Sequence, residues 1–501
     1  MLYNSTQNAA EVVSAAQAIA QGISKDGGLF VPQEFPKYSA ETFNELLKLD
    51  YKGRAKKVFA DFLSDFTEEE INDCVENAYT KEKFGSDNPA PLAYAKLNGK
   101  ELNILELWHG PTCAFKDMAL QILPHFLTKS LKKTYDGKDA VILVATSGDT
   151  GKAALEGFKD VDHTKIIVFY PVDGVSPMQK HQMNTQEGNN VTVCAIKGNF
   201  DDAQTGVKKI FTTPEISAKL EANNMLFSSA NSINWGRLVP QIVYYFSTYC
   251  DLINMGKINA GDKINVVVPT GNFGNILAGY YAKKMGLPIK KLICASNSNN
   301  VLTDFLKTGT YDRNRAFYTT TSPSMDILIS SNLERLLYHM SGEDDALIRD
   351  LMAQLSENGK YTVSDKLICD IQAVFDAGFT AEDKVDETIK EHFDKYSYLC
   401  DTHTAVAVDV YDEYVKATGD DIPTVIDSTA SPYKFSKSVL AAVNGGKAPD
   451  LDEFDMVDAL YKKTGFEVPK PLASLKSKKV RFNNVCSKDD MSEMVFKLLE
   501  L

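Results

Sequence analysis

The chain has 501 residues, of which 44% are hydrophobic and 24% are charged, which excludes a disordered, collagen-like or disulfide-dominated protein. Its 54 Lys and Arg residues against 67 Asp and Glu residues give a formal net charge of −13. Because this charge repels nucleic-acid phosphates, we expect no nucleic-acid partner.

The eight cysteines stand singly, without the spacing of a zinc site, which predicts reduced thiols and no bound metal. The first residues, MLYNSTQNAAEVVS, lack the basic and apolar segments of a secretory signal. No run approaches the roughly 18 apolar residues of a membrane span. These patterns predict a cytoplasmic protein that does not bind a membrane.

Residues 1–95 are predicted to form a mostly helical domain. Thr67 and Glu70 have the spacing of a capping box, so a helix is expected to begin near Thr67. Alternating hydrophobicity around Asn98–Gly99 predicts a β-hairpin over Leu92–Leu107. Further helices are expected over Ala9–Ser24, Glu41–Leu49 and Arg54–Asp65.

From about Ala140, short apolar runs alternate with turns and amphipathic stretches. The runs are AVILVA, KIIVFY, VTVCAI, MLFSSA, KINVVVP, KLICAS and, later, DIPTVIDST. Apolar strands that alternate with helices form parallel sheets covered on both faces, so the predicted fold class is α/β. Because these runs are more than one sheet typically holds, we expect two α/β domains, residues 96–255 and 256–501, with a helical C-terminal part.

Three stretches follow strands or open helices, where α/β proteins bind ligands. The first, Thr146–Gly151 with the sequence TSGDTG, places small residues and hydroxyls at a helix start, which suits a carboxylate or a phosphate. The second, Gly271–Asn275, has two glycines and two asparagines but lacks the lysine of a nucleotide-binding P-loop, which favours a cofactor phosphate. For both stretches, an ordinary strand-to-helix turn is the structural alternative.

The third stretch, His109–Asp117, is a compact turn that leads into an amphipathic segment. Lys116 is expected at or just before the first helical turn, where the helix dipole disfavours a cation and lowers the pKa of the amine. The alternative is a solvated Lys116 paired with Asp117.

The three stretches occur together and in order, and in this combination the chain resembles the threonine synthases. HGPTCAFKD is similar to their Schiff-base lysine motif, TSGDTG to their substrate loop and PTGNFGN to their cofactor-phosphate loop. Other similar stretches are Asn231–Arg237, Ser322–Leu336 and Asp401–Val406, and the opening segment with Asp26–Pro32 resembles the longer microbial and fungal type. The resemblance covers nearly the whole chain.

The resemblance implies a fold-type-II pyridoxal-phosphate enzyme, similar in architecture to the tryptophan synthase β-subunit. Such an enzyme converts O-phospho-L-homoserine and water into L-threonine and phosphate, the last step of threonine biosynthesis. Lys116 would hold pyridoxal 5′-phosphate and act as the catalytic base, although the released phosphate could replace it during water addition. Thr429 would lie against the pyridine nitrogen. The cofactor phosphate would be bound by Gly271, Asn272, Phe273, Gly274 and Asn275.

The same resemblance assigns the substrate groups. Its carboxylate and amino-acid end would be received by Ser147, Asp149 and Thr150, and its phosphate by Asn231, Ser232 and Arg237. Asp149 raises a chemical question, because shorter relatives have Asn there, whose amide can donate to the cofactor phenolate, whereas an ionised carboxylate cannot donate. Either Asp149 carries a proton, the phenol does, or the side chain points elsewhere.

Two departures and two alternative functions stay open. Ser431 stands where many relatives have His, which leaves no role for that histidine, and His403 is retained in a motif that has lost its proline. A related phospholyase would release phosphate without making threonine, and a non-catalytic relative would only bind. The expected assembly is a monomer or a homodimer.

Overall fold

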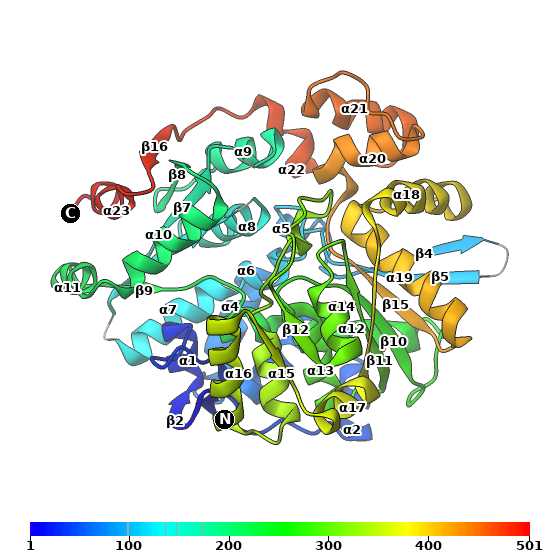
Figure 1. The fold of residues 1–501 in the computed structure, drawn as a ribbon, viewed down its shortest axis with the longest axis horizontal. Coiled ribbons are helices and arrows are strands. Elements are labelled where there is room, and N and C mark those ends of the chain that lie inside the picture. Colours follow the sequence, from blue (N-terminus) through cyan, green and yellow to red (C-terminus); the bar gives the residue numbers. More distant parts are fainter. Residues whose placement is uncertain (98–99, 136, 147, 174) are drawn as a thin grey trace.

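Two β-sheets with helices on their faces position the loops that carry the predicted site residues (Figure 1). The structure is a computed structural model that describes residues 1–97, 100–135, 137–146, 148–173 and 175–501. The predicted hairpin tip Asn98–Gly99 and the predicted substrate residue Ser147 lie outside the described residues. Strands of both sheets run parallel to their neighbours, which confirms the predicted α/β fold class.

The N-terminal region combines five helices with a small antiparallel sheet of order β2-β1-β3. Its elements are β1 (Leu2–Ser5), β2 (Asn8–Ser14), α1 (Ala15–Gln21), β3 (Phe30–Pro32), α2 (Ala40–Leu46), α3 (Tyr51–Phe62), α4 (Glu68–Ala78) and α5 (Lys81–Phe84). The expected capping box is confirmed, since Thr67 Oγ1 accepts from the Glu70 N–H at 3.1 Å and Glu70 Oε2 accepts from the Thr67 N–H at 2.8 Å.

The helix expected over Ala9–Ser24 is wrong in its first part. Residues up to Ser14 form β2, which pairs with β1, and the helix begins only at Ala15. Ser14 and Gln17 form a capping box that sets this start. The β-branched pair Val12–Val13 favours the strand that precedes it.

The larger sheet has six strands in the order β14-β11-β10-β15-β5-β4, and only β4 runs antiparallel to its neighbour. These strands are β4 (Leu92–Leu97), β5 (Lys100–Glu106), β10 (Ile264–Pro269), β11 (Ile289–Ser296), β14 (Phe375–Phe379) and β15 (Thr424–Ser428). The neighbours β10, β15 and β5 are followed by the Gly271 loop, by Thr429 and by the Lys116 turn. Because parallel strands end at the same edge, the sheet brings these three segments together.

Helices cover both faces of this sheet. Val266 and Val268 of β10 belong to a core cluster that contains Leu277, whereas Val267 belongs to a second cluster that contains Val406. Successive side chains of a strand point to opposite faces, so the helices that carry Leu277 and Val406 cover different faces. The helices of this region are α12 (Trp235–Asn254), α13 (Gly274–Met285), α14 (Val301–Thr308), α15 (Leu333–Met340), α16 (Asp345–Asn358), α17 (Asp365–Val374), α18 (Glu382–Tyr396), α19 (Thr402–Thr418), α20 (Ser436–Val443), α21 (Glu453–Thr464) and α22 (Lys470–Ala473). A two-stranded antiparallel ribbon is formed by β12 (Thr310–Asp312) and β13 (Lys360–Thr362).

The second sheet has five parallel strands in the order β16-β8-β7-β6-β9. The strands are β6 (Asp139–Ala145), β7 (Thr164–Pro171), β8 (Val191–Lys197), β9 (Met225–Ser228) and β16 (Asn484–Ser487). The TSGDTG stretch directly follows β6 and opens α8. The associated helices are α6 (Asp117–Leu120), α7 (Leu123–Thr134), α8 (Asp149–Phe158), α9 (Pro177–Asn184), α10 (Phe200–Thr212), α11 (Pro214–Ala222) and α23 (Met491–Leu499).

Strands from distant parts of the chain are exchanged between the two sheets. The hairpin of β4 and β5 joins the sheet that otherwise comes from residues 264–428, and β16 near the C-terminus joins the other sheet. The predicted ranges 96–255 and 256–501 do not follow this exchange, because a strand's own sequence does not specify its partner strand.

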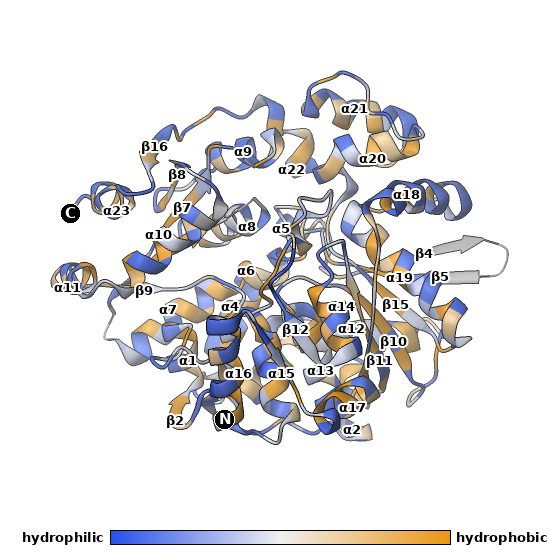
Figure 2. Ribbon diagram, viewed as in Figure 1, coloured by the Kyte–Doolittle hydropathy of each residue, from blue (hydrophilic) through white to orange (hydrophobic). Residues whose placement is uncertain are grey.

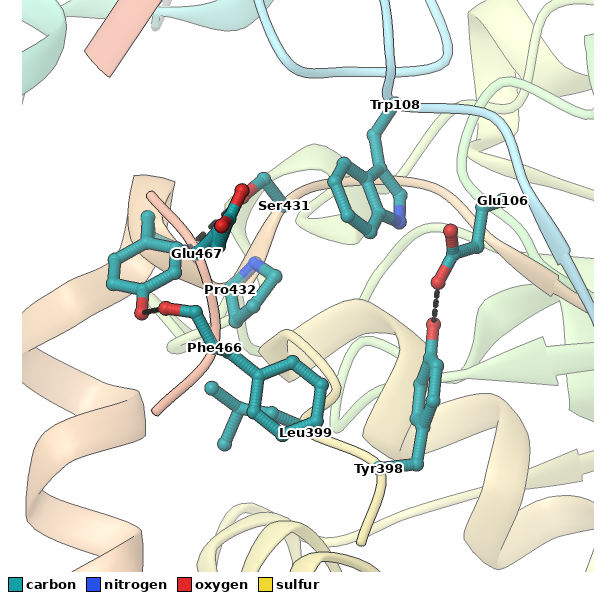
Figure 3. A pocket seen from close by; sticks show the side chains of 9 residues that line it. Glu106, Trp108, Tyr398, Leu399, Ser431, Pro432, Phe466 and Glu467 are labelled. Atoms are coloured by element: carbon teal, nitrogen blue, oxygen red, sulfur yellow. Dashed lines mark hydrogen bonds between the residues drawn. The ribbon is translucent and has the colours of Figure 1, made fainter. Parts of the chain in front are cut away.

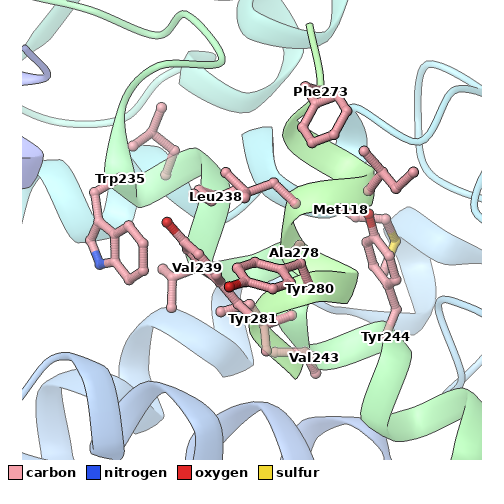
Figure 4. Packing of buried hydrophobic residues seen from close by; sticks show 14 of the residues in the cluster. Met118, Trp235, Leu238, Val239, Val243, Tyr244, Phe273, Ala278, Tyr280 and Tyr281 are labelled. Carbon is pink, nitrogen blue, oxygen red and sulfur yellow. The ribbon is translucent and has the colours of Figure 1, made fainter. Parts of the chain in front are cut away.

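The hydrophobic core lies between the sheets and their helices, where Figure 2 shows hydrophobic residues concentrated in the strands. Aromatic residues of α12 and α13 pack together at its centre (Figure 4). Tyr3 and Phe62 of the N-terminal region pack against Trp235, with ring centroids 5.1 and 5.5 Å away. The N-terminal region is therefore anchored to α12. Within the described residues, no helix combines the length and apolar character that crossing a membrane requires.

Candidate active site

Lys116 sits at the N-cap position of α6, at the end of a turn that Asp117 closes. The Asp117 carboxylate accepts from the Thr112 N–H at 2.8 Å and from the Thr112 hydroxyl at 2.7 Å. A Cβ on Gly110 would lie 2.5 Å from the Asp117 side chain, so the turn requires a glycine there. Asp117 is thus engaged by Thr112, and the Lys116 amine instead donates to Ser324 Oγ at 3.1 Å.

The Lys116 amine is buried, with the residue only 9% exposed. Burial lowers the pKa of Lys116 to about 8; Asp149 opposes this effect, and the cations Lys434 and Arg237 add to it. The lowered pKa of Lys116 agrees with the sequence-based expectation, but its cause differs. Helix α6 has only four residues, and burial rather than the helix dipole is the main cause.

Seven residues from separate segments line a cavity around this amine. Three of them, Lys116, Asp149 and Thr429, were predicted for the site, and the structure brings them together. The lining residues are Phe115, Lys116, Asp149, Ser324, His403, Thr429 and Ala430. The Thr429 carbonyl accepts from the Phe115 N–H at 2.8 Å, which ties the end of β15 to the Lys116 turn.

Asp149 is an ionised residue in this cavity. Its Oδ1 lies 2.8 Å from the Lys434 amine and accepts from the Gln179 amide at 3.0 Å. Burial by itself raises the pKa of Asp149, but Lys434, Lys116 and these hydrogen bonds outweigh it and hold the pKa well below its usual range. Of the three possibilities for Asp149, the ion pair with Lys434 favours an ionised side chain, and this residue lines the cavity as a hydrogen-bond acceptor.

In the TSGDTG stretch, the Thr146 hydroxyl occupies two backbone amides. Thr146 Oγ1 accepts from the N–H groups of Gly148 and Gly151, each at 3.0 Å, so these two amides are not free for an anion. A Cβ on Gly148 would meet the Gln179 amide at 2.4 Å, which explains the glycine. Thr150 lies half-buried in the first turn of α8.

The Gly271–Asn275 loop connects β10 to the start of α13. Phe273 has a φ of 62°, and a Cβ on Gly271 would lie 2.5 Å from the Ser324 carbonyl oxygen. Gly274 begins the 12-residue helix α13, whose first N–H groups favour an anion. The loop thus has the backbone shape of a phosphate cradle.

The Asn275 side chain is committed to a buried network. Its Oδ1 accepts from the Tyr244 hydroxyl at 2.5 Å and from the Tyr245 hydroxyl at 2.7 Å, and its Nδ2 donates to Asp427 at 3.0 Å. Burial raises the pKa of Asp427 to about 7, against the effect of its hydrogen bonds from Asn275 and Tyr245. Any phosphate contact of Asn275 therefore has to come from its backbone.

Arg237 is a buried cation at the start of α12, with an exposed fraction of 4%. One nitrogen donates to the Ala230 carbonyl at 2.9 Å, whereas Nε has no hydrogen-bond partner. Burial lowers the pKa of Arg237 to about 10. Among the described residues, no carboxylate forms a salt bridge with this guanidinium, and such an arrangement suits an anionic ligand.

The loop with Asn231, Ser232 and Arg237 is joined to the Gly271–Asn275 loop through Asn332. The buried Asn332 side chain donates both to the Ser232 carbonyl at 3.2 Å and to the Asn272 carbonyl at 2.9 Å. The Asn231 side chain is exposed at the surface of the loop. The structure therefore places the two predicted phosphate-binding loops side by side.

Sequence reasoning missed several residues of the site. Lys434, Ser324 and Gln179 were not proposed as site residues, and His403 had no assigned role. The signal for Lys434 was present in the stretch TASPYKF, where a lysine follows a buried strand. Ser431, in the same stretch, is buried and its hydroxyl accepts from the Tyr433 N–H at 3.3 Å, which is a structural role.

A second pocket lies farther along the segment that carries Thr429 (Figure 3). Glu106 in this pocket accepts from the Tyr398 hydroxyl at 2.9 Å and pairs with His109 at 2.7 Å. None of the described residues predicted for the site lines this pocket. Its lining residues are Glu106, Trp108, Tyr398, Leu399, Ser431, Pro432, Tyr433, Phe466 and Glu467.

The residues around Lys116 fit pyridoxal phosphate. The buried amine of Lys116 suits a carbonyl group, and the Gly271 loop leads into the N-terminus of α13, which suits a phosphate. Within the described part of the chain, no group of three His, Cys, Asp or Glu residues is arranged to hold a metal ion.

Three family models match consecutive parts of the chain. They are described as threonine synthase N terminus over residues 2–79, pyridoxal-phosphate dependent enzyme over residues 87–364, and threonine synthase C-terminal over residues 404–495.

Individual proteins show the same similarity. The chain is 40% identical to human threonine synthase-like 1 over 85% of this chain, and it spans 58% of that longer relative. It is 37% identical to threonine synthase of Saccharomyces cerevisiae over 89% of each chain. A crystal structure of PLP-bound threonine synthase from Brucella melitensis superposes with a TM-score of 0.87 at 38% identity, covering 99% of this chain and 98% of that chain.

Proposed function

This chain belongs to the threonine synthase family of pyridoxal-phosphate-dependent enzymes, and we propose that it converts O-phospho-L-homoserine and water into L-threonine and phosphate. One observation carries the proposal for this chain: a buried lysine of lowered pKa feels the charge of a buried arginine that has no carboxylate partner among the described residues. An amino acid that bears a phosphate matches this pair.

The cofactor would be held by three segments: Lys116, the loop from Gly271 through Asn272, Phe273 and Gly274 to Asn275, and Thr429. When bound, pyridoxal phosphate withdraws electrons from the substrate's carbon skeleton and so acidifies its C–H bonds. The Thr429 hydroxyl cannot bear a negative charge at neutral pH, so it would leave the pyridine nitrogen uncharged.

Lys116 would move the protons of the reaction. With a pKa of about 8, its amine is partly neutral at physiological pH and can accept a proton, whereas an ordinary lysine is almost fully charged. Ser324 Oγ, 3.1 Å away, would orient the amine.

The substrate would lie between two charged groups. Ionised Asp149 accepts hydrogen bonds only, so it would receive the amino end of the substrate rather than its carboxylate, which leaves Ser147 and Thr150 for the carboxylate. Arg237, with Asn231 and Ser232, would bind the phosphate through charge-assisted hydrogen bonds.

The test incubates the cofactor-loaded protein with O-phospho-L-homoserine and measures phosphate and threonine separately. Equal amounts of both support the proposal. Phosphate without threonine would identify a phospholyase instead, and neither product would indicate a protein that only binds. The two products are measured separately because one matched relative is named threonine synthase-like rather than threonine synthase.

One variant tests the role of Lys116. Lys116→Ala should abolish turnover while the protein stays folded, and Lys116→Ala that retains activity would refute the catalytic assignment. The proposal also includes a cytoplasmic location and a monomer or homodimer, which fractionation and light scattering test.

A further inference from the structure

Two sequence stretches without an assigned role, Ser322–Leu336 and Asp401–Val406, meet beside Lys116. The first contains a short 3-10 turn, Pro323–Met325, and the second opens α19. The Ser324 N–H donates to His403 Nε2 at 3.1 Å, and the Thr402 hydroxyl donates to the Thr321 carbonyl at 2.7 Å. The start of α19 therefore holds the turn by one hydrogen bond and the residue Thr321, just before the turn, by another.

The histidine of this contact has a defined tautomer. His403 Nδ1 lies 2.7 Å from Asp401 Oδ2, a carboxylate that caps α19 by accepting from the N–H groups of His403 and Thr404. Since the backbone N–H of Ser324 can only donate, Nε2 must be the acceptor and the ring proton must be on Nδ1. Asp401 accepts that proton's hydrogen bond and so fixes the orientation of the ring.

The turn that His403 holds touches two functional parts of the site. Ser324 Oγ accepts from the Lys116 amine at 3.1 Å. The Ser324 carbonyl oxygen packs closely against Gly271, where a Cβ would approach it to 2.5 Å. A displacement of this turn would therefore disturb both the amine and the phosphate cradle.

We propose that Asp401 and His403 are positioning residues that hold the Pro323–Met325 turn so that Ser324 Oγ receives the Lys116 amine. The hydrogen bonds of Asp401, His403 and Ser324 are observed in the structure, whereas their effect on turnover rests on the proposed function. His403 is 2% exposed and lines the cavity, with its ring 4.9 Å from that of Phe435. It acts through Ser324 and needs no contact with the substrate.

The first experiment measures amide hydrogen exchange of Ser324 in the cofactor-free protein. His403→Leu removes the acceptor, so the Ser324 amide should exchange about tenfold faster, the effect of losing one hydrogen bond. His403→Gln offers an amide oxygen near the place of Nε2 and should restore most of the protection. His392→Leu is the matched control, because His392 is a buried histidine near a carboxylate, Asp412 at 3.5 Å, outside the cavity.

The second experiment measures kinetics and cofactor release. His403→Leu and Ser324→Ala should lower kcat about tenfold or more with KM within threefold, because the groups proposed to bind substrate are retained. His403→Leu should also raise the Kd for pyridoxal phosphate, since the turn that packs against Gly271 is no longer held. His392→Leu should change neither kcat nor this Kd.

Each outcome decides the inference. Unchanged Ser324 exchange in His403→Leu would refute it, as would equal effects in His392→Leu, which would reveal a general loss of stability. If His403→Leu does not fold, Asp401→Asn replaces it in the same experiment. Asn keeps the cap of α19 but allows His403 to carry its proton on Nε2, and this N–H would repel the Ser324 N–H. A wild-type protein that makes no threonine would refute the proposed function alone, because exchange and cofactor release still report on the turn.

Discussion

The buried ion pair of Lys434 and Asp149 makes a quantitative prediction for Lys434→Met. Lys434 comes from the segment after β15 and Asp149 from the start of α8, so the pair connects the two sheets. Their side chains are 0% and 4% exposed. Methionine keeps an unbranched apolar chain nearly as long as the lysine stem and removes the charge, which leaves the Asp149 carboxylate buried without its cation.

The magnitude follows from this geometry. At the separation of 2.8 Å, the attraction between the charges is about 6 kcal/mol for an effective dielectric constant of about 20. Part of this attraction offsets the cost of burying both ions. Removing one partner of such a pair costs about 3–5 kcal/mol, because the remaining charge is left uncompensated. The variant also removes the hydrogen bond that the Lys434 amine donates to the Thr112 carbonyl at 2.8 Å.

The loss should depend on pH. In the wild-type protein the pKa of Asp149 lies below its unfolded value of about 3.9, so the carboxylate contributes stability above pH 4 that is lost as the pH falls further. In Lys434→Met the remaining burial raises the pKa of Asp149, which lets the group take up a proton at a higher pH. The difference in unfolding free energy between the two proteins should therefore shrink as the pH is lowered from 7 toward 4.

Urea unfolding followed by tryptophan fluorescence measures these differences. Lys366→Met is the control, because its pair with Asp370 is exposed, with side-chain exposures of 86% and 48%, so its loss should change stability far less than the loss of the buried pair. A loss in Lys434→Met no larger than in Lys366→Met would refute the reasoning. A difference that does not change between pH 7 and pH 4 would show that removing Lys434 does not raise the pKa of Asp149.

Three further predictions concern other parts of the site. The rate at which an amine-specific reagent labels Lys116 in the cofactor-free protein, mapped by mass spectrometry, should rise with a midpoint near pH 8, whereas exposed lysines titrate near 10.4. Gly271→Ala should weaken cofactor binding in equilibrium dialysis, because its Cβ would meet the Ser324 carbonyl at 2.5 Å. The nearest contacts of a Cβ on Gly274 are at 3.5 Å, so Gly274→Ala should leave the melting temperature of the protein nearly unchanged. Arg237→Lys should lower kcat/KM for O-phospho-L-homoserine about 10- to 100-fold, mainly through KM, since lysine lacks the planar pair of donors; unchanged kinetics would remove Arg237 from the phosphate site.

Local sequence predicted much of the fold because caps and apolar runs act over a few residues. The capping box at Thr67 and the runs that became β6, β7, β8, β10, β11 and β15 needed no tertiary information. The helix expected over Ala9–Ser24 was wrong because pairing with β1 stabilises the strand up to Ser14. The exchange of β4, β5 and β16 between the sheets could not be predicted, since parallel partners are far apart in the chain.

The sequence by itself identified the loops that we propose to carry the chemistry. Lys116, Gly271 and Arg237 were recognisable because their motifs are short and continuous. Only the tertiary structure decided their physical state, because burial and neighbouring charges come from distant segments. Lys434 makes Asp149 an ionised acceptor, burial makes Lys116 a weaker base than free lysine, and His403 brings Ser324 to its amine. A pKa or a hydrogen bond depends on what surrounds a group in space, and no local pattern contains that information.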